Sequence, residues 1–174
     1  SSVGIGKARD EKEFHEAVKD AFQYDQKIIV EQFIKGREIE CSVLGNEKPR
    51  ASLPGEVIPK HDFYSYEAKY LDENGAVLKI PADLPKPVIK KIQNLAVEAF
   101  KVLGCEGLAR VDMFLTSGDK IYINEINTIP GFTKISMYPK LWEASGLPYP
   151  DLLDKLIKLA QNRFAKKKLL KTSF

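Results

Sequence analysis

Cysteine, histidine and tryptophan are scarce in this chain, whose 174 residues include two Cys, two His and one Trp. Cys41 and Cys105 lie in apolar stretches of different predicted elements, so they form no disulfide framework. We interpret both as buried, reduced thiols of a cytoplasmic protein. His15 and His61 have no partner residues at catalytic or metal-ligand spacing, and we expect both to be surface histidines.

Long apolar runs are also missing, because the longest ones have the length of strands and fall well short of the ~20 residues of a membrane-spanning helix. The chain opens on a Ser-Gly stretch rather than on a basic segment followed by an apolar one, which argues against a signal peptide. Its net charge of +3 comes largely from Lys166, Lys167, Lys168 and Lys171. We interpret these lysines as a solvated helix end, and we expect no membrane or nucleic-acid partner.

The apolar pattern predicts an α+β fold, since the short apolar strands come in runs that are separated by amphipathic helices. The expected elements are a helix over residues 10–22, strands over 27–33, 39–44 and 50–58, a helix over 85–103, a hairpin over 107–127, and helices over 136–145 and 150–168. Residues 60–75 form a loop too long for a simple connection, and loops of that length tend to be functional. We therefore expect a small lobe over residues 1–59, a loop over 60–75 and a larger lobe over 76–174.

The hairpin carries the clearest chemical signal, because its two apolar strands also hold an arginine, two acids and an asparagine. With residues 116–119 as an unpaired turn, Asp112 would face Ile123 and Arg110 would face Glu125. Side chains alternate between the faces of a strand, so the four polar residues should share one face. Tyr122 and Asn124 should lie on the other face, together with Ala109, Val111 and Met113.

Asp112, Glu125 and Asn127 offer hard oxygen donors, which favour Mg2+ or Mn2+ over zinc, and we expect them to hold two such ions together with a nucleotide. Arg110 beside them would neutralise an oxyanion or a phosphoryl oxygen. The alternative is a purely structural pair, in which Arg110 and Glu125 satisfy one another across the ladder. That alternative leaves Asp112 and Asn127 unexplained.

Four segments in order resemble the ATP-grasp carboxylate-amine ligases, and within them the D-alanine-D-alanine ligase family. They are residues 1–5 (SSVGI), 31–38 (EQFIKGRE), 63–70 (FYSYEAKY) and 107–133, which includes GLARVD and NEINTIPGFT. The resemblance covers essentially the whole chain and implies an ATP-grasp fold. It also places Ser1 inside a nucleotide-binding loop, and as the chain begins without Met we expect it to be a fragment that is inactive in isolation.

The resemblance also implies roles in binding ATP. Ser2 would touch phosphate, Lys69 would reach the γ-phosphate, and Glu38 would bind the ribose. The adenine would bind beside Glu31, Gln32, Phe33 and Ile34, chiefly through the backbone, because Gln32 stands where similar enzymes commonly have Lys. Without the resemblance, residues 31–38 read equally well as a plain hairpin with exposed acids.

For the amino-acid substrates the resemblance implies that Tyr70, linked through Ser1, orients the first D-alanine. The Pro130-Gly131 turn would aim the Gly131 amide at an oxyanion alongside Arg110, and Ser136 with Met137 would hold the second substrate. Ser136 also suits a simple helix cap, and both roles are compatible.

The implied reaction joins two D-alanine molecules through an acyl-phosphate, at the expense of ATP, for peptidoglycan synthesis. As a whole protein we expect a cytoplasmic homodimer. A D-alanine-D-lactate or D-alanine-D-serine ligase is the alternative within the class, and a catalytically inactive nucleotide-binding module is the alternative outside it.

Overall fold

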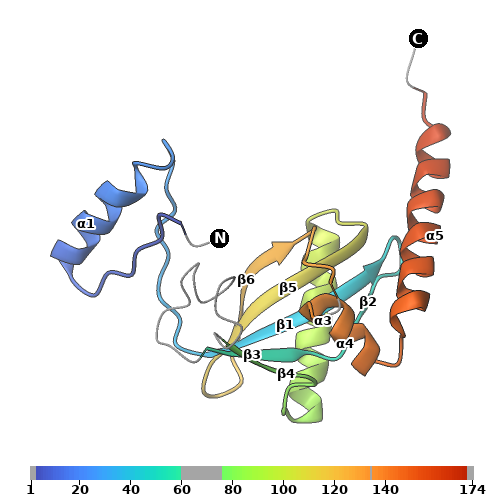
Figure 1. The fold of residues 1–174 in the computed structure, drawn as a ribbon, viewed down its shortest axis with the longest axis horizontal. Helices are drawn as coiled ribbons and strands as arrows, with labels where there is room; N and C mark the ends of the chain where they lie inside the picture. The colour runs from blue at the N-terminus through green and yellow to red at the C-terminus, as the bar shows by residue number, and fades with distance from the viewer. Residues whose placement is uncertain (1–2, 60–75, 134, 172–174) are drawn as a thin grey trace. The chain divides into compact units, whose positions relative to one another are not determined.

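The computed structural model describes residues 3–59, 76–133 and 135–171, and its chain divides into two units (Figure 1). The first comprises Ser1–Ile34 with Pro59–Val77, and the second comprises Lys35–Ile58 with Leu78–Phe174. Four residues to which we assign a role, Ser1, Ser2, Lys69 and Tyr70, lie outside the described residues, as does His61.

Helix α1 (Glu11–Ala21) organises the first unit and confirms the helix expected over residues 10–22. Its N-cap is Asp10, whose carboxylate accepts a hydrogen bond of 2.8 Å from the backbone N–H of Glu13, and this satisfies one of the donors that a helix start leaves open. The loop before the helix packs closely on it, because a Cβ at Gly6 would lie 2.7 Å from the Cβ of Ala17. His15 lies on the exposed surface of the helix, as expected.

The strand expected over residues 27–33 is not formed in the described structure. Ile29, Val30 and Phe33 are exposed, with 81%, 64% and 64% of their surfaces accessible. A strand is stable only where a neighbour pairs with its backbone groups, and no described segment pairs with this one. Lys7 lies over the ring of Phe33, 3.8 Å from its centroid, and ties the extended segment to the loop before α1.

The second unit is built on a sheet with the strand order β4-β3-β1-β5-β6, with β2 paired to β1. Its strands are β1 (Arg37–Gly45), β2 (Arg50–Ala51), β3 (Gly55–Pro59), β4 (Ala76–Lys79), β5 (Gly107–Leu115) and β6 (Ile121–Asn127). The strands expected over 39–44 and 50–58 are therefore present, the second as the two strands β2 and β3 with residues 52–54 between them. Their place differs from the expected small lobe over residues 1–59, because β1 pairs with β5 along its whole length. Long-range pairing of this kind cannot be read from local sequence.

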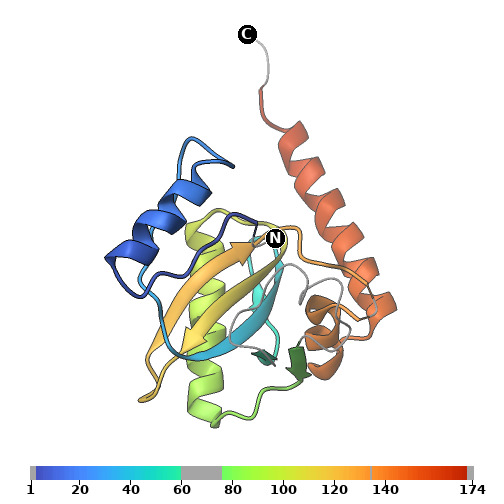
Figure 2. The ribbon, with the colours of Figure 1, turned by 60° about the vertical axis from the view of Figure 1, so that its left-hand side comes forward.

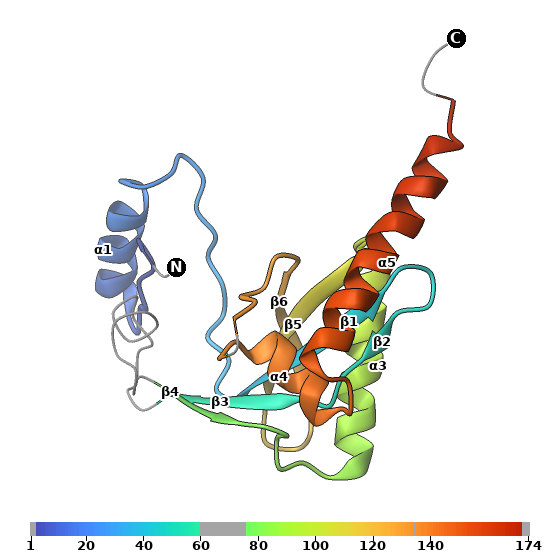
Figure 3. The ribbon, with the colours of Figure 1, turned by 45° about the vertical axis from the view of Figure 1, so that its right-hand side comes forward.

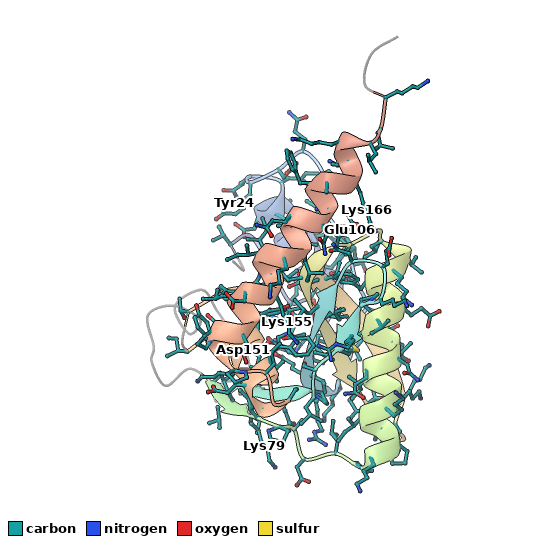
Figure 4. All side chains as sticks on the ribbon, turned by 90° about the vertical axis from the view of Figure 1, so that its right-hand side faces the viewer. Tyr24, Lys79, Glu106, Asp151, Lys155 and Lys166 are labelled. Carbon is teal, nitrogen blue, oxygen red and sulfur yellow. The ribbon has the colours of Figure 1, made fainter. Side chains whose placement is uncertain are left out.

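Helix α3 (Lys86–Val102) covers one face of the sheet and confirms the helix expected over residues 85–103. Figure 4 shows the strands between α3 on one side and α5 on the other. The core beneath α3 is closely packed and apolar, and it comprises Ile39, Cys41, Val43, Ala82, Val88, Ile92, Ala96, Phe100, Ala109, Val111, Met113 and Leu115. Odd-numbered residues of β1 and β5 thus face α3, and even-numbered residues face away from it.

The opposite face is covered at one end by α4 (Met137–Ala144) and α5 (Tyr149–Lys168), both expected from the sequence (Figure 3). A second cluster packs there, made of Leu44, Tyr138, Trp142, Leu147 and Leu152. The buried Tyr138 hydroxyl donates a hydrogen bond of 3.0 Å to the carbonyl of Val43, and this fixes α4 to β1. These contacts lie at the β1 end near Leu44, away from Glu40 and Asp112 on the same face.

Cys41 and Cys105 are both unpaired thiols, as expected. Cys41 is fully buried, whereas Cys105 is only partly buried, so the expectation of two buried thiols is wrong for Cys105. Cys105 follows Gly104, which has a positive φ of 64° after the end of α3, and it packs against the core from a partly buried position. Among the described helices, none is both long enough and apolar enough to span a membrane.

Candidate active site on the outer face of the hairpin

The expected hairpin of β5 and β6 is present, but its register differs from the expected one. Leu115 pairs with Ile121 and Met113 with Ile123, one residue away from the expected partners. The turn is longer than expected because Lys120 does not join the ladder, although its carbonyl accepts a backbone hydrogen bond of 3.0 Å from Thr116. Asp119 in this turn has a positive φ of 60°.

A bulge then moves the register by one further residue. Met113 pairs with Ile123 but Asp112 pairs with Glu125, so Asn124 is an extra residue in β6. Beyond the bulge Arg110 pairs with Asn127. Without that extra residue to change the alternation, Glu125 would point to the α3 side of the sheet.

The bulge produces the shared polar face that the sequence predicted. The sequence pattern did not show that a bulge was needed to form it. Arg110, Asp112, Glu125 and Asn127 lie on the face away from α3, while Ile121 and Ile126 pack against the core on the other face. Tyr122 pairs with Phe114 and so lies on the polar face, where the sequence had placed it on the apolar one. Figure 2 shows β5 and β6 side by side with α3 behind them.

Arg110 is the centre of the site and is mostly buried, with 19% of its side chain exposed. Its Nε and Nη2 donate hydrogen bonds of 2.7 Å each to the two carboxylate oxygens of Asp112, a bidentate pair along one strand. A second carboxylate, Glu40 of β1, lies with its Oε2 at 3.0 Å from Arg110 Nε. Arg110 and Glu125 do not form the purely structural pair that was the alternative. The ion pairs of Arg110 with described residues are to Asp112 and Glu40.

Around Arg110, the polar face of the hairpin carries more negative than positive charge. Burial by itself would lower the pKa of Arg110, but hydrogen bonds to Asp112 and the charges of Glu40, Asp112 and Glu125 outweigh burial and raise that pKa. One guanidinium thus faces three carboxylates. Asp112 and Glu125 stand directly opposite one another, an arrangement that is unfavourable in a sheet unless a cation lies nearby.

The donor set suits a hard divalent cation, whereas the arrangement of its side chains is only partly that of a metal site. Carboxylate oxygens of Asp112 and Glu125 and the amide oxygen of Asn127 are the ligand types that Mg2+ and Mn2+ prefer. Within residues 3–59, 76–133 and 135–171, no group of three or more His, Cys, Asp or Glu side chains is placed to hold a metal ion. Both oxygens of Asp112 are engaged by Arg110, and the Asn127 amide oxygen accepts a hydrogen bond of 3.1 Å from the Ile129 backbone.

The loop after β6 connects this face to the start of α4. Ser136 occupies the N-cap position of α4, but its side chain makes no capping hydrogen bond to the helix. Its hydroxyl accepts a hydrogen bond of 3.0 Å from the backbone of Thr133 instead, and it lies 3.1 Å from where a Cβ of Gly131 would be. Gly131 and Ser136 are therefore neighbours, while Met137 is buried at the first turn of the helix.

The predicted adenine-binding residues lie in the first unit, which is described by itself. Glu31, Gln32 and Phe33 are exposed and Ile34 is half-buried. The backbone groups of residues 31–34 make no hydrogen bonds to described backbone. Glu38, the predicted ribose ligand, belongs instead to β1 of the second unit.

Glu40 is the site residue that sequence reasoning missed. It pairs with Asp112 across the β1–β5 ladder and lies 15% exposed beside Arg110. A signal was present in the sequence, because Glu38 and Glu40 are two residues apart and so share a face of the strand. What the sequence could not show was that β1 is the neighbour of β5.

Comparison with known proteins gives one consistent family. Residues 1–158 match the family model described as D-ala D-ala ligase C-terminus. A D-alanine--D-alanine ligase of Oceanobacillus iheyensis is 63% identical over 173 residues, which are 99% of this chain and 47% of that protein.

Two solved structures are similar in fold as well as in sequence. The VanG D-Ala:D-Ser ligase from Enterococcus faecalis has a TM-score of 0.83 at 40% identity, covering 91% of this chain and 46% of that one. The D-alanine--D-alanine ligase from Bacillus anthracis complexed with ATP has a TM-score of 0.76 at 29% identity, covering 92% and 51%. The α+β architecture of this chain is thus the ATP-grasp architecture expected from the sequence.

These findings place the chain in a family of ATP-grasp ligases. The chain belongs to the D-alanine-D-alanine ligase family and matches its C-terminal domain. It spans about half the length of the curated relatives that it matches.

Proposed function

We propose that a protein containing this chain joins two D-alanine molecules into D-alanyl-D-alanine, with hydrolysis of ATP to ADP and phosphate, for peptidoglycan precursor synthesis. The observation that carries the proposal is the polar face of the hairpin, where Asp112 stands opposite Glu125 and Arg110 opposite Asn127. This is a negatively biased face with one buried arginine, in a chain 63% identical to a D-alanine--D-alanine ligase. The ATP bound to the Bacillus anthracis relative supports the choice of nucleotide.

The chemistry runs in two steps. The carboxylate of the first D-alanine attacks the γ-phosphorus of ATP, so that an acyl-phosphate forms and ADP leaves. The deprotonated amine of the second D-alanine then attacks the acyl carbon, and phosphate leaves from the tetrahedral intermediate. Arg110 and the backbone N–H of Gly131 stabilise the oxyanion of that intermediate, since donors fixed in place before the reaction need no reorganisation during it.

Asp112, Glu125 and Asn127 would hold Mg2+ or Mn2+, two ions in the complete site. When bound, the cation offsets the negative charge of the β- and γ-phosphates. Glu125 is exposed, and its carboxylate has no hydrogen bond or ion pair with a described side chain, so it is available as a ligand. Asn127 would turn its amide oxygen from the Ile129 backbone toward the ion.

The remaining contacts are assigned by resemblance to the family. ATP would bind through Ser2, Lys69, Glu38 and the backbone of residues 31–34, whose exposed peptide groups suit an adenine edge. Ser1, Tyr70, Ser136 and Met137 would position the amino-acid substrates, and the closeness of Ser136 to Gly131 supports this for the second one. A homodimer remains our prediction for the whole protein, with no nucleic-acid or membrane partner.

The likeness to VanG favours D-serine as the second candidate for the incoming substrate. Both reactions use the same acyl-phosphate and differ only in the amine that attacks it. A competition assay with equal D-alanine and D-serine decides between them, and dominant D-alanyl-D-serine would show that the second candidate is right.

The metal assignment is tested by Glu125→Gln in the full-length protein. The variant removes a charge but almost no volume, so we expect the D-alanine-dependent release of ADP to fall by about 100-fold or more without a change in melting temperature. Glu98→Gln on the exposed side of α3 is the matched control and should behave like the parent protein. Near-parental turnover of Glu125→Gln, with an unchanged magnesium requirement, would contradict the assignment.

A further inference from the structure

We propose that Glu40 is a positioning residue that holds Arg110 in place when Asp112 turns to bind the cation. The inference rests on the proposed function. It assigns to Glu40 a part in the reaction that neither the sequence pattern nor the comparisons assign to it.

The geometry puts two carboxylates around one guanidinium. Glu40 pairs directly with Asp112 across β1 and β5, and Arg110 is two residues from Asp112 on the same face. Arg110 Nε is 2.7 Å from an oxygen of Asp112 and 3.0 Å from Oε2 of Glu40. The Nε–H donates to Asp112 in the structure, so the contact with Glu40 is an ion pair through space.

In this arrangement Asp112 offers a metal ion only the lone pairs that Arg110 leaves unused. Its two oxygens accept both donors of the bidentate pair with Arg110. A divalent cation on the same carboxylate would lie close to the guanidinium, and the two positive charges would repel one another. Binding of the cation therefore weakens the contact of Arg110 with Asp112.

Burial makes the loss of that contact costly unless another carboxylate replaces it. The side chain of Arg110 is 19% exposed, and a mostly buried charge without a partner is strongly destabilising. Glu40 is itself only 15% exposed and already lies within ion-pair distance. A small rotation of the guanidinium exchanges Asp112 for Glu40, so Arg110 stays charged, paired and on the outer face of the hairpin.

If Arg110 exchanges Asp112 for Glu40, Glu40 should affect cation binding more than it affects the stability of the fold. Without cation, Arg110 keeps its bidentate pair with Asp112, so neutralising Glu40 should cost less stability than removal of the carboxylate from a bidentate pair. With cation, Arg110 needs Glu40, so neutralising it should weaken cation binding. Outer partners of metal ligands typically change metal affinity by about 10-fold to 100-fold when they are replaced.

The test is Glu40→Gln in the full-length protein, with Glu40→Asp as the conservative variant. The matched control is Glu56→Gln, because Glu56 forms a similar bidentate pair with Arg37, at 2.7 Å for both bonds and with its side chain 10% exposed. Glu56 pairs with Ile39 in the ladder and so lies on the opposite face of the sheet. Three quantities are measured for each protein: the affinity for Mn2+ in the presence of ADP, the melting temperature without metal, and kcat with the KM for D-alanine.

We expect Glu40→Gln to weaken Mn2+ binding and lower kcat by about tenfold each, with a KM for D-alanine close to the parent value and a smaller loss of melting temperature than Glu56→Gln shows. Glu40→Asp keeps the charge on a shorter side chain and should recover part of both losses. Glu56→Gln should show the reverse pattern, a lower melting temperature with unchanged Mn2+ affinity.

Parental Mn2+ affinity in Glu40→Gln would overturn the inference, and so would a loss of melting temperature as large as that of Glu56→Gln. If Glu40→Gln does not fold, Glu40→Asp decides, because parental Mn2+ affinity and kcat in that variant would also overturn it. Failure of the proposed function is a separate result, since the parent protein would then form no dipeptide.

Discussion

Deletion of Asn124 tests the bulge that forms the polar face. Asn124 is the extra residue between Ile123, which pairs with Met113, and Glu125, which pairs with Asp112. After the deletion the ladder would run without interruption, and each remaining residue of β6 would keep both its partner and its face. The deletion should therefore be tolerated by the fold.

The expected change in melting temperature follows from the backbone hydrogen bonds between β5 and β6. Closing the bulge pairs backbone groups that it disrupts, and one hydrogen bond contributes about 0.5–1.5 kcal/mol. For a protein of this size 1 kcal/mol shifts the melting temperature by about 2–4 °C, so we expect a change between zero and about +6 °C. In a hairpin with the regular register predicted from the sequence, in which Arg110 faces Glu125, the same deletion would move Glu125 to the α3 side and Ile126 into water, and loss of the isoleucine alone would cost about 1.5–3 kcal/mol.

Thermal unfolding of the parent and the deletion variant measures this difference directly. The control is deletion of Ile126, which packs against the core and lies in the regular part of the strand. We expect that control to melt about 3–12 °C below the parent. An Asn124 deletion that is as unstable as the Ile126 deletion would refute the register and the bulge derived from it.

Two further predictions concern a partly buried ion pair and a buried thiol. The hydrogen bonds from Arg37 lower the pKa of Glu56, so their contribution to stability is complete above about pH 4.3, the ordinary value of a glutamate, and is lost as the pH falls through the lowered value. The melting temperature of Glu56→Gln should accordingly depend less on pH between about pH 5 and 2 than that of the parent protein, and parallel curves would contradict this. Burial raises the pKa of Cys41 to about 12, so iodoacetamide should label Cys41 only in denaturant, and labelling of the native protein, detected by mass spectrometry of its peptides, would show that the thiol is accessible.

The sequence by itself determined most of the local structure. Helical spacing and caps located α1, α3, α4 and α5, because the signals that start and stop a helix lie within a few residues of its ends. The polar residues of β5 and β6 also predicted a shared polar face on the hairpin, which is the site that we propose for the chemistry. The motifs of the ATP-grasp ligases lie in short contiguous segments, and so the family could be recognised without a structure.

Tertiary structure decided which strands are neighbours and in which register. Strand β1 pairs with β5 across more than 60 positions of sequence, and this pairing brings Glu40 to Arg110 and places β1 outside the lobe to which the sequence had assigned it. The segment over residues 27–33 has the composition of a strand but forms none among the described residues, because pairing requires a partner that local composition does not supply.

The position of the bulge at Asn124 follows from the sequence pattern and the tertiary packing together. The alternation of apolar residues breaks between Ile123 and Ile126, but the sequence does not say whether the turn or the strand absorbs the change. Packing against α3 decides it, because Ile121 and Ile126 both reach the core only if an extra residue lies between them. The burial of these two side chains thus fixes the face on which Glu125 and Asn127 lie.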